Sequence, residues 1–556
     1  MKKIFGLVAF IVVVGFSSEA KETPFGLEIN HGELLNLTSI SLDVQDNLQL
    51  VAQAEEIERH GGRTNHGKML SAVGVDELNS GTWTLLENGD KVWQLRMHSS
   101  GALAISVFFN NLYLPQGSSL FVYPTDQSYF EGPFLLSDCA AHGYFATPEV
   151  LGDDVVLEYY EPAGVVAKTN IQLRGIGHYY RFIYDYRDMR GAASDFCEVD
   201  VNCPEGGEWT AERDAAVRLQ LTDGGDIFLC SGSLVNTTEM DCRKYILTAF
   251  HCVEGISNAD LLLASVRFNY ERDGCGTGSA PTRNKAGVVK HADSNDGGGN
   301  NGSDFALLEM EDAIPSAWTP YFAGWDASSG TPVSGVSIHH PNGDVKKIST
   351  TEDVISGTWG APGFHWRVEW METETEWGVT EGGSSGSPLY NQNHHIVGQL
   401  TGGGSFCTQP TANDYYGKMS KNWSANPNPS DEKLKEWLDP TNQSNNGAIA
   451  MFGSYVNTNL SLPCSINTAV EEQQMKFDDV AIYPTIAQGD ITITTAGFRD
   501  MKEVRIYDSA GALVEVFALK DVQNIFKLSH YSAGLYYMTF LHINGSQLTK
   551  KFTVAK

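Results

Sequence analysis

Three short segments of this sequence carry side chains that together can perform nucleophilic acyl transfer. Hydrolysis of a peptide bond by a serine needs a hydroxyl, an imidazole that takes its proton, a carboxylate that holds the imidazole, and amide donors for the oxyanion. His251 follows the apolar run 245–250, Asp304 precedes the apolar run 305–308, and Ser385 lies in a glycine-rich turn. These segments predict a triad in which Ser385 attacks, His251 moves the proton and Asp304 orients the imidazole.

The glycines around Ser385 are part of this prediction. Gly382, Gly383 and Gly386 allow a tight backbone turn, which exposes the hydroxyl and points the amides of Gly383 and Ser385 at one place. Taken singly, each segment has a plainer interpretation: a histidine beside a cysteine is usually structural, an acid before a strand usually belongs to a turn, and a Gly-Ser run is usually a loop. The order, spacing and chemistry of the three together favour catalysis.

The elements that must position these residues are short strands. From residue 204 to residue 450, apolar runs alternate with turns, and the stretch 296–302 is rich in glycine and asparagine, which predicts a surface loop in an all-β region. Residues 83–160 also alternate apolar and polar side chains, and the chain after residue 463 suggests a small β-sandwich. The first of these β regions precedes the triad region and is a candidate propeptide, with a permanently attached accessory module as the alternative.

The N-terminus has the features of a secretory signal peptide. Lys2 and Lys3 precede the apolar run 4–16, and residues 18–20 form a small-x-small cleavage signal. The alternative is a membrane anchor, but this run is shorter than the roughly 20 residues that span a bilayer, and we expect no stable membrane span elsewhere. Because export permits disulfides, the nine cysteines indicate a bonding framework with at least one cysteine left over.

The charge balance and the remaining motifs exclude several other classes of function. A net charge of -30, from 38 basic and 68 acidic residues, argues against a nucleic-acid partner, since phosphate binding requires basic patches. The pairs His339-His340 and His394-His395 lack the spacing of a zinc-protease helix and are interpreted as structural or surface histidines. We expect no metal and no cofactor.

The segments around the triad resemble the trypsin superfamily and, more closely, the bacterial lysyl endopeptidase family. The similarity extends through the motifs 197–206, 230–236, 338–342, 378–381 and 436–440. It implies a mainly β fold, in which a trypsin-like double β-barrel protease domain is flanked by an N-terminal β-sandwich-like propeptide and a small C-terminal β-sandwich. It also implies three disulfides, which would join Cys197 to Cys407, Cys203 to Cys275, and Cys230 to Cys252.

The resemblance also assigns substrate-binding residues. Asp414 lies in a segment similar to the one that carries the family's lysine-binding aspartate, and the alternative is an ordinary turn aspartate. A buried carboxylate without an internal partner is costly, so it selects a substrate cation that neutralises it. Trp359 matches a tryptophan that in the family packs against a histidine, but that histidine position here is Thr401, so we expect this aromatic pairing to be absent.

The activation of the enzyme is expected to differ from that of trypsin. Ser384 replaces the aspartate that in trypsin receives the new amino terminus. By the family's spacing the mature enzyme begins near Gly191, which places Arg190 before the cut. Either the enzyme accepts arginine and matures itself, or another trypsin-like protease makes this cut.

The C-terminal region is similar to the type IX secretion sorting domain. The similarity rests on the segments 482–485, 504–508, 534–536 and 551–556. It implies that the type IX secretion machinery carries the protein across an outer membrane and that this region is then removed or anchored at the surface. The alternative is a carbohydrate-binding or adhesive sandwich.

The sequence therefore predicts a secreted serine endopeptidase that reaches the cell surface or the medium through the periplasm. Its substrates would be proteins or peptides cut after basic residues, with lysine preferred. The alternative from another class is a non-enzymatic surface adhesin on an inactive protease scaffold, although no triad residue is missing. The expected parts are a signal peptide (1–20), a β-rich propeptide (21–190), the protease domain (191–450), a linker (451–473) and the sorting domain (474–556).

Overall fold

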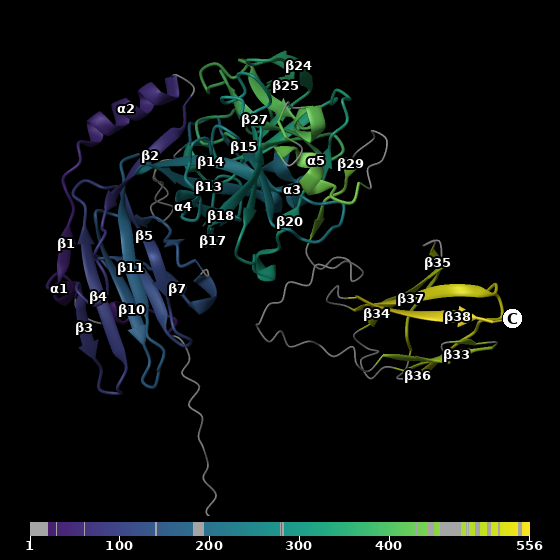
Figure 1. The fold of residues 1–556 in the computed structure, drawn as a ribbon. Helices are drawn as coiled ribbons and strands as arrows, with labels where there is room; N and C mark the ends of the chain where they lie inside the picture. Colours follow the sequence, from purple (N-terminus) through teal and green to yellow (C-terminus); the bar gives the residue numbers. More distant parts are fainter. Residues whose placement is uncertain are drawn as a thin grey trace, which may run out of the picture. The chain divides into compact units, whose positions relative to one another are not determined.

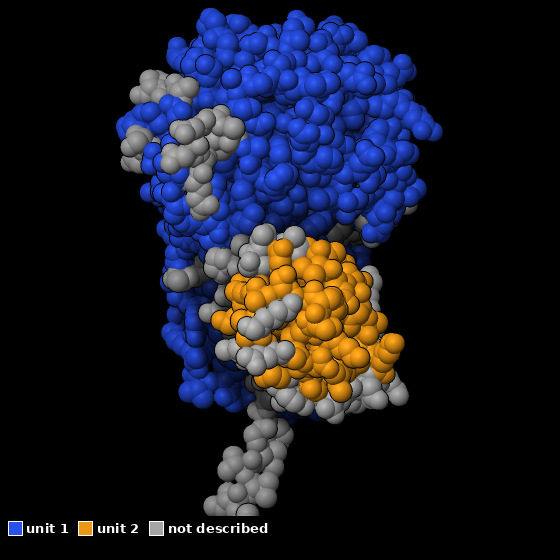
Figure 2. Space-filling model, turned by 90° about the vertical axis from the view of Figure 1, so that its right-hand side faces the viewer, with its two compact units in different colours: residues 1–456 blue, residues 457–556 orange. Residues whose placement is uncertain are grey.

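In the computed structural model the protein has two compact units, residues 1–456 and 457–556, which are coloured separately in Figure 2. The predicted signal peptide and the predicted maturation site between Arg190 and Gly191 lie outside the described residues. The described residues are 21–28, 31–59, 62–139, 142–181, 194–278, 280, 283–425, 428–429, 432–442, 450–455, 480–484, 486–487, 489–494, 501–508, 513–520, 523–542 and 547–555.

The first unit begins with a β-sandwich, here called the N-terminal domain (residues 21–181). Apolar residues at alternate positions of its strands point inward, and side chains such as Trp93, Val107 and Phe109 form a shared core between two sheets. One sheet contains β1 (Ser39–Ser41), β3 (Thr82–Leu85), β4 (Lys91–His98), β6 (Ser119–Pro124), β7 (Glu131–Phe134) and β10 (Asp154–Glu161); the other contains β2 (Thr64–Ser71), β5 (Ala104–Tyr113), β8 (Phe145–Ala146), β9 (Val150–Leu151) and β11 (Asn170–Tyr179).

The rest of the first unit, residues 194–455, is called the protease region. Among its described residues, the strand pairings form two extended sheets and a two-stranded ladder, and no ring of strands. Its first sheet contains β13 (Ala216–Asp223), β14 (Asp226–Leu234), β15 (Tyr245–Ala249), β16 (Ser265–Phe268), β17 (Arg283–Ala286), β18 (Val288–Asp293) and β19 (Phe305–Met310).

The second sheet of the protease region carries most of the remaining strands. Its strands are hydrogen-bonded in the order β12 (Val199–Asp200), β23 (Lys347–Thr351), β22 (Gly335–His339), β26 (Pro388–Asn391), β27 (Ile396–Gly403), β28 (Asp414–Lys418), β25 (Pro362–Glu369) and β24 (Asp353–Thr358). Short helices connect the strands, among them α3 (Thr210–Ala215), α4 (Asn258–Leu261) and α5 (Leu434–Leu438). Two further strands belong to this sheet: β21 (Trp325–Asp326) pairs with β27 and with β29 (Ala450–Met451). The two-stranded ladder consists of β20 (Tyr321–Phe322) and β30 (Ser454–Tyr455).

One strand connects the two parts of the first unit. Strand β2 pairs with β11 of the N-terminal domain and also, antiparallel, with β14 of the protease region, so a twelve-stranded sheet passes through both parts. The helix α2 (Asn47–Arg59), which no sequence pattern had singled out, precedes β2, as Figure 1 shows. The N-terminal domain therefore adds a strand to the sheet that carries the predicted catalytic histidine.

The second unit is a small two-sheet structure around its own core of buried aliphatic and aromatic residues. The mainly β fold class predicted from the sequence is confirmed. In the described part of the chain, no helix has the length and apolar character needed to cross a membrane. The strands of this unit are β31 (Ala481–Tyr483), β33 (Ile491–Thr494) and β36 (Gln523–Phe526) in one sheet, and β32 (Ile486–Ala487), β34 (Met501–Asp508), β35 (Leu513–Phe517), β37 (Gly534–His542) and β38 (Gln547–Val554) in the other.

Candidate active site

Strand pairing brings His251 and Asp304 together. Strands β15 and β19 pair antiparallel with Ala249 opposite Phe305, so the histidine that follows β15 lies beside the aspartate that precedes β19. Asp304 Oδ2 is 2.7 Å from His251 Nδ1, and Asp304 Oδ1 accepts a hydrogen bond of 2.9 Å from the backbone amide of His251. The carboxylate therefore fixes both the ring and the backbone of the histidine.

The environment of Asp304 holds its carboxylate in this position. The residue is fully buried, and its backbone has a left-handed φ of 56°, which is uncommon for a residue with a side chain. Its amide donates to Asp296 Oδ2 at 2.8 Å. Burial of the imidazole lowers the pKa of His251, but the adjacent charge of Asp304 outweighs this effect, and the pKa is raised above its usual value of 6.5.

Ser385 lies on a turn that only glycine-rich sequence can form. Gly383 and Gly386 have φ values of +88° and +83°, and a side chain at Gly386 would place its Cβ 2.1 Å from Thr248 Oγ1. The carbonyl of Ser385 accepts a 2.8 Å hydrogen bond from the amide of Ser231 on β14. In the described part of the chain, the amides of Gly383 and Ser385 donate no hydrogen bond, which leaves both free for an oxyanion.

Ser384, the residue that replaces the trypsin aspartate, is buried. Its hydroxyl is 2.8 Å from His339 Nδ1, and the other ring nitrogen of His339 is 2.9 Å from Ser349 Oγ. Burial lowers the pKa of His339 to about 3, so this histidine is neutral near pH 7. A neutral hydrogen-bonded histidine therefore contacts the residue before Ser385.

A cavity of about 310 Å³ is lined by two residues of the predicted triad and by two of the predicted substrate-binding residues, Trp359 and Thr401. His251 and Ser385 line it, with Nδ1 of the histidine turned to Asp304. Among the described residues, no hydrogen bond joins Ser385 Oγ to His251 Nε2, and such contacts commonly tighten only when substrate binds. The other lining residues are Glu58, Gly62, Thr64, Asn342, Trp359, Thr380, Glu381, Gly382, Leu400, Thr401, Gly402, Gly403, Ser405 and Phe406.

Asp414 lies behind one wall of this cavity and is fully buried. The expectation that its carboxylate lacks internal partners is wrong: Oδ2 accepts hydrogen bonds from Trp370 Nε1, Thr380 Oγ1 and Ser405 Oγ at 2.6, 2.7 and 2.6 Å, and Oδ1 accepts one from the amide of Ser405 at 3.1 Å. All these donors are neutral. Burial raises the pKa of Asp414 more than these hydrogen bonds lower it. The carboxyl group is thus hydrogen-bonded on both oxygens, and no cation among the described residues pairs with it.

Thr401 and Trp359 both line this cavity. Thr401 Oγ1 is 3.1 Å from Nε2 of His365, a buried histidine whose pKa burial lowers to about 4. The Trp359 ring lies over Gly402, where a Cβ would be 3.3 Å from it, and its centroid is 5.6 Å from that of Tyr415. A histidine therefore does lie beside Thr401, and it is supplied by β25.

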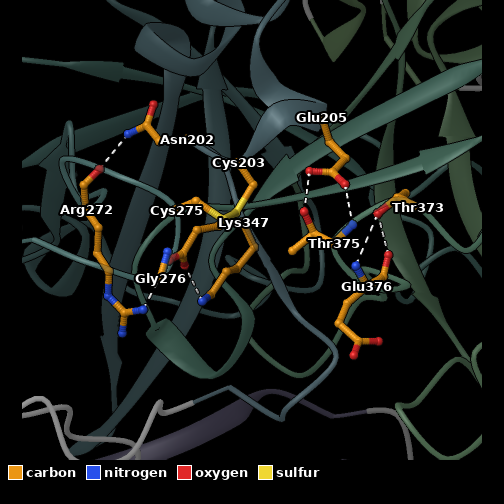
Figure 3. Close-up of a disulfide and its surroundings, with 11 residues drawn as sticks. Asn202, Cys203, Glu205, Arg272, Cys275, Gly276, Lys347, Thr373, Thr375 and Glu376 are labelled. Carbon is orange, nitrogen blue, oxygen red and sulfur yellow. Dashed lines mark hydrogen bonds and ion pairs between the residues drawn. A yellow bond between two sulfur atoms is a disulfide. The ribbon is translucent and has the colours of Figure 1, made fainter.

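The structure contains the three disulfides that the resemblance implied. Cys230–Cys252 joins β14 to the residue after His251, and Cys197–Cys407 joins the start of the protease region to the segment that carries Ser405. Figure 3 shows Cys203–Cys275, near which Lys347 and Arg272 both bind Asp200. Among the described residues, Cys139 is the free cysteine.

The clusters that resemble metal sites do not offer free ligand sets. One contains His251 with Cys230 and Cys252, and the other contains Cys407 with two carboxylates. The sulfur atoms of all three cysteines are already in disulfides. Of the histidine pairs, His340 is buried, and His394 stacks on Trp209 with ring centroids 4.2 Å apart.

Several residues of the site escaped the sequence analysis. Asp296 supports Asp304, while Thr380, Ser405 and Trp370 hold Asp414. Serine, threonine and tryptophan carry no distinctive signal in a single sequence. The one usable sign was for Asp296, because it begins the glycine-rich loop that ends just before Asp304.

Comparisons with known proteins agree with the sequence motifs. Residues 191–417 match the family model of the lysyl endopeptidase C-terminal domain, and residues 481–555 match that of the secretion system C-terminal sorting domain. A lysyl endopeptidase of Pseudomonas aeruginosa is 29% identical over 303 residues, which are 51% of this chain and 62% of that relative. The resemblance to the lysyl endopeptidase family and to the sorting domain is thus confirmed.

Two solved structures show weaker likeness. A thermostable serine protease from an extremophilic microorganism has a TM-score of 0.29 at 14% identity, with 38% of this chain and 93% of that chain covered. The protease Anisep from Arthrobacter nicotinovorans has a TM-score of 0.28 at 17% identity, with 38% and 91% covered.

Proposed function

We propose that this relative of the lysyl endopeptidases is a serine endopeptidase that cleaves after basic residues and prefers lysine. Ser385 Oγ attacks the substrate carbonyl, His251 takes the hydroxyl proton and returns it to the leaving amine, and the amides of Gly383 and Ser385 hold the oxyanion. A second cycle with water releases the acyl group. The observation that supports this most is that His251, bonded to the buried Asp304, lines the same cavity as Ser385.

The preference for lysine follows from the surroundings of Asp414. Its side chain is buried, no cation in the described part of the chain pairs with it, and three neutral donors already bind Oδ2. A lysine ammonium is a compact charge that can bind one free acceptor site, whereas the planar arginine fork needs two acceptors in a fixed geometry. We therefore infer that lysine is bound better than arginine.

The cleaved residue is tested with three peptides that differ only in the residue before the scissile bond: lysine, arginine or norleucine. We expect kcat/KM to be highest for lysine, about 10- to 100-fold lower for arginine, and lower still for norleucine, since it leaves Asp414 unneutralised. Equal rates for lysine and arginine would contradict the lysine preference and make self-maturation at Arg190 feasible. If none of the three is cleaved, the inactive adhesin scaffold is favoured.

The rate should also depend on pH through His251. Its imidazole must be neutral to accept the serine proton, so kcat/KM should rise with pH through an apparent pKa above 6.5, because Asp304 raises the pKa of the ring. Asp304→Asn should shift this acid limb of the pH profile, the rise of kcat/KM with pH, to lower pH and should reduce kcat about 10⁴-fold. A pH–rate profile of both proteins checks this, and an acid limb that stays in place in Asp304→Asn contradicts the assigned role of Asp304.

We further propose that the protein is exported through the periplasm to the cell surface or the medium. The match of residues 481–555 to a sorting domain supports recognition of residues 474–556 by the type IX secretion machinery. The apolar run 4–16 supports a signal peptide over residues 1–20. The propeptide would then be residues 21–190, and the protease domain residues 191–450, followed by a linker over 451–473.

A further inference from the structure

The backbone of Asp304 has a conformation that an aspartate does not favour by itself. A left-handed φ is unfavourable for a residue with a side chain, so it persists only where neighbouring groups hold it. The carbonyl of Asp304 accepts a 2.9 Å hydrogen bond from the amide of Phe250, the residue before His251. The amide of Asp304 donates to Asp296 Oδ2 at 2.8 Å. A second carboxylate, at the start of the glycine-rich loop 296–302, therefore holds the backbone from which the proposed catalytic carboxylate projects.

Asp296 also closes this loop on itself. Its Oδ1 accepts a 2.9 Å hydrogen bond from the amide of Gly299, and its carbonyl oxygen accepts one of 3.1 Å from the amide of Asn301. The three consecutive glycines 297–299 have φ values between +66° and +79°, which residues with side chains rarely adopt. A Cβ on Gly302 would lie 2.4 Å from Asp296 Oδ2, so the chain needs a glycine where it passes the carboxylate.

The closed loop packs against both members of the proposed catalytic pair. A Cβ on Gly298 would be 3.4 Å from the Cβ of His251, which is ordinary van der Waals contact. A Cβ on Gly299 would be 3.2 Å from the Cβ of Asp304 and 3.1 Å from Thr401 Cγ2, which are tighter contacts. Because Thr401 lines the cavity, the loop lies between the catalytic pair and one wall of that cavity.

The loop also contacts two other residues beside the cavity. A Cβ on Gly360, the residue after Trp359, would lie 2.3 Å from the Cα of Asn300, so the two backbones touch. The buried His365 lies close as well, since its Nε2 would be 3.1 Å from a Cβ on Gly299. The loop is therefore packed on several sides, and a displacement of its carboxylate would be passed on to the catalytic pair.

The side chain of Asp296 is buried without a cation. The residue is 7% exposed, and no described residue forms an ion pair with it, whereas Lys290 pairs with Asp293 and His251 with Asp304. Burial raises the pKa of Asp304, and the negative charge of Asp296 adds to this effect. The same charge favours the imidazolium that forms when His251 takes the serine proton.

We propose that Asp296 is a positioning residue of this active site, which holds the backbone of Asp304 and places a second negative charge beside it. This inference rests on the proposed endopeptidase function. Asp296 does not line the cavity, so it acts through Asp304 and touches no substrate. It therefore sets the rate of acyl transfer, while binding of the substrate cation near Asp414 does not depend on it.

The first variant, Asp296→Asn, is made in the full chain and matured in the same way as the parent. Asparagine removes the charge and can accept only one of the two amide hydrogen bonds. We expect kcat for the lysine peptide to fall about 10- to 100-fold at unchanged KM, as for a catalytic group misplaced by about 1 Å. The acid limb of the pH profile should move to lower pH, because the imidazolium loses a neighbouring negative charge. The ratio of lysine to norleucine cleavage should stay that of the parent.

The second variant, Gly302→Ala, displaces the carboxylate and keeps its charge. Gly302 does not have a positive φ, so alanine is compatible with its backbone, but the new Cβ would collide with Asp296 Oδ2. We expect kcat to fall about 10-fold or more, again at an unchanged ratio of lysine to norleucine cleavage.

The matched control is Asp293→Asn. Asp293 is also 7% exposed and lies three residues before Asp296, but its carboxylate pairs with Lys290 at 2.6 Å. The control should keep the kcat and the pH profile of the parent. The other charged groups near the imidazole of His251, Arg63 and Glu254, are the same in all these proteins.

Three outcomes would overturn the proposal. The first is an Asp296→Asn enzyme with the kcat and acid limb of the parent, and the second is an equal loss in Asp293→Asn. The third is a loss of rate together with a loss of the lysine preference, which would show that Asp296 supports the whole cavity wall. If Asp296→Asn does not fold, full activity of Gly302→Ala contradicts the positioning role.

Failure of the endopeptidase function is distinguishable from failure of this inference. A parent enzyme that cleaves neither peptide and does not react with a fluorophosphonate overturns the endopeptidase function. The pKa of His251 can still be measured by NMR titration of its ring protons. A pKa of His251 that is lower in Asp296→Asn than in Asp293→Asn supports the proposed contact, and equal values contradict it.

Discussion

Ser385→Ala should lower kcat for peptide hydrolysis by about 10⁴- to 10⁶-fold while leaving the fold intact. The hydroxyl is the nucleophile, and no other described side chain lies where it could replace it: Ser384 points to His339, and Ser387 is buried. The measurement is kcat/KM of the cut enzyme on a lysine peptide, together with labelling by a fluorophosphonate, which should be lost.

The matched control is Ser329→Ala, an exposed serine in the loop after β21. It should retain full activity and labelling. Because Ser385 makes its structural hydrogen bond through the backbone carbonyl, alanine preserves that contact, and the melting temperature of Ser385→Ala should equal that of the parent. Cleavage at lysine that persists in Ser385→Ala would overturn the assignment of the nucleophile.

The residues that we propose as catalytic are those for which the sequence carries the clearest local signals. His251 and Asp304 each adjoin an apolar run, which marks both residues locally, whereas the pairing of the two strands that brings them together is a long-range contact. The turn at Ser385 is also marked locally, because Gly383 and Gly386 permit the positive φ that this turn requires. These local marks need no knowledge of distant partners, but the contact between His251 and Asp304 does.

The contacts of the N-terminal domain could not be predicted in this way. Strand β2 lies outside the β region predicted over residues 83–160, and nothing in its residues indicates that Thr64 pairs with Leu229, far away in the chain. Helix α2 lacks a clear apolar stripe, since Leu48 and Ile57 are exposed, so its sequence gives no strong helical signal. Glu149 forms ion pairs with Arg218 and Arg267. This contact depends on the tertiary structure and could not be predicted either, because a single glutamate in a sequence carries no signal that it is buried.

Asp414 shows the same limit inside the site. Asp414 was identified because its segment resembles one that carries a substrate-binding aspartate, but we expected its carboxylate to have no partners inside the protein. The fold instead surrounds it with hydroxyl, indole and amide donors from three separate segments. Selectivity for a cation therefore cannot come from unmet hydrogen bonds, and must come from the uncompensated charge.

This distinction leads to the second large effect: Asp414→Asn should reduce kcat/KM for a lysine peptide by about 10²- to 10⁴-fold. Loss of a buried charge partner for the substrate ammonium costs roughly 3–5 kcal/mol, and 1.4 kcal/mol corresponds to a factor of ten. Asparagine keeps the size of the side chain and one acceptor oxygen but removes the charge. The norleucine peptide should lose little, so the ratio of lysine to norleucine cleavage is the quantity to measure.

A stability measurement separates this role from a structural one. Burial raises the pKa of Asp414 in the folded protein, so ionisation of its carboxyl group favours the unfolded chain. The contribution of Asp414 to the free energy of unfolding is therefore most favourable below the pKa of the unfolded state and is lost as the pH rises through the pKa of the folded state. At pH 7 the asparagine variant should therefore be no less stable than the parent in urea unfolding. The control is Asp353→Asn, at a half-exposed residue that is paired with Arg367 at 3.5 Å. It should change neither the stability in urea unfolding nor the ratio of lysine to norleucine cleavage by more than a small factor. Lysine and norleucine peptides that lose rate equally in Asp414→Asn would show that Asp414 supports the wall of the cavity and does not bind the substrate cation.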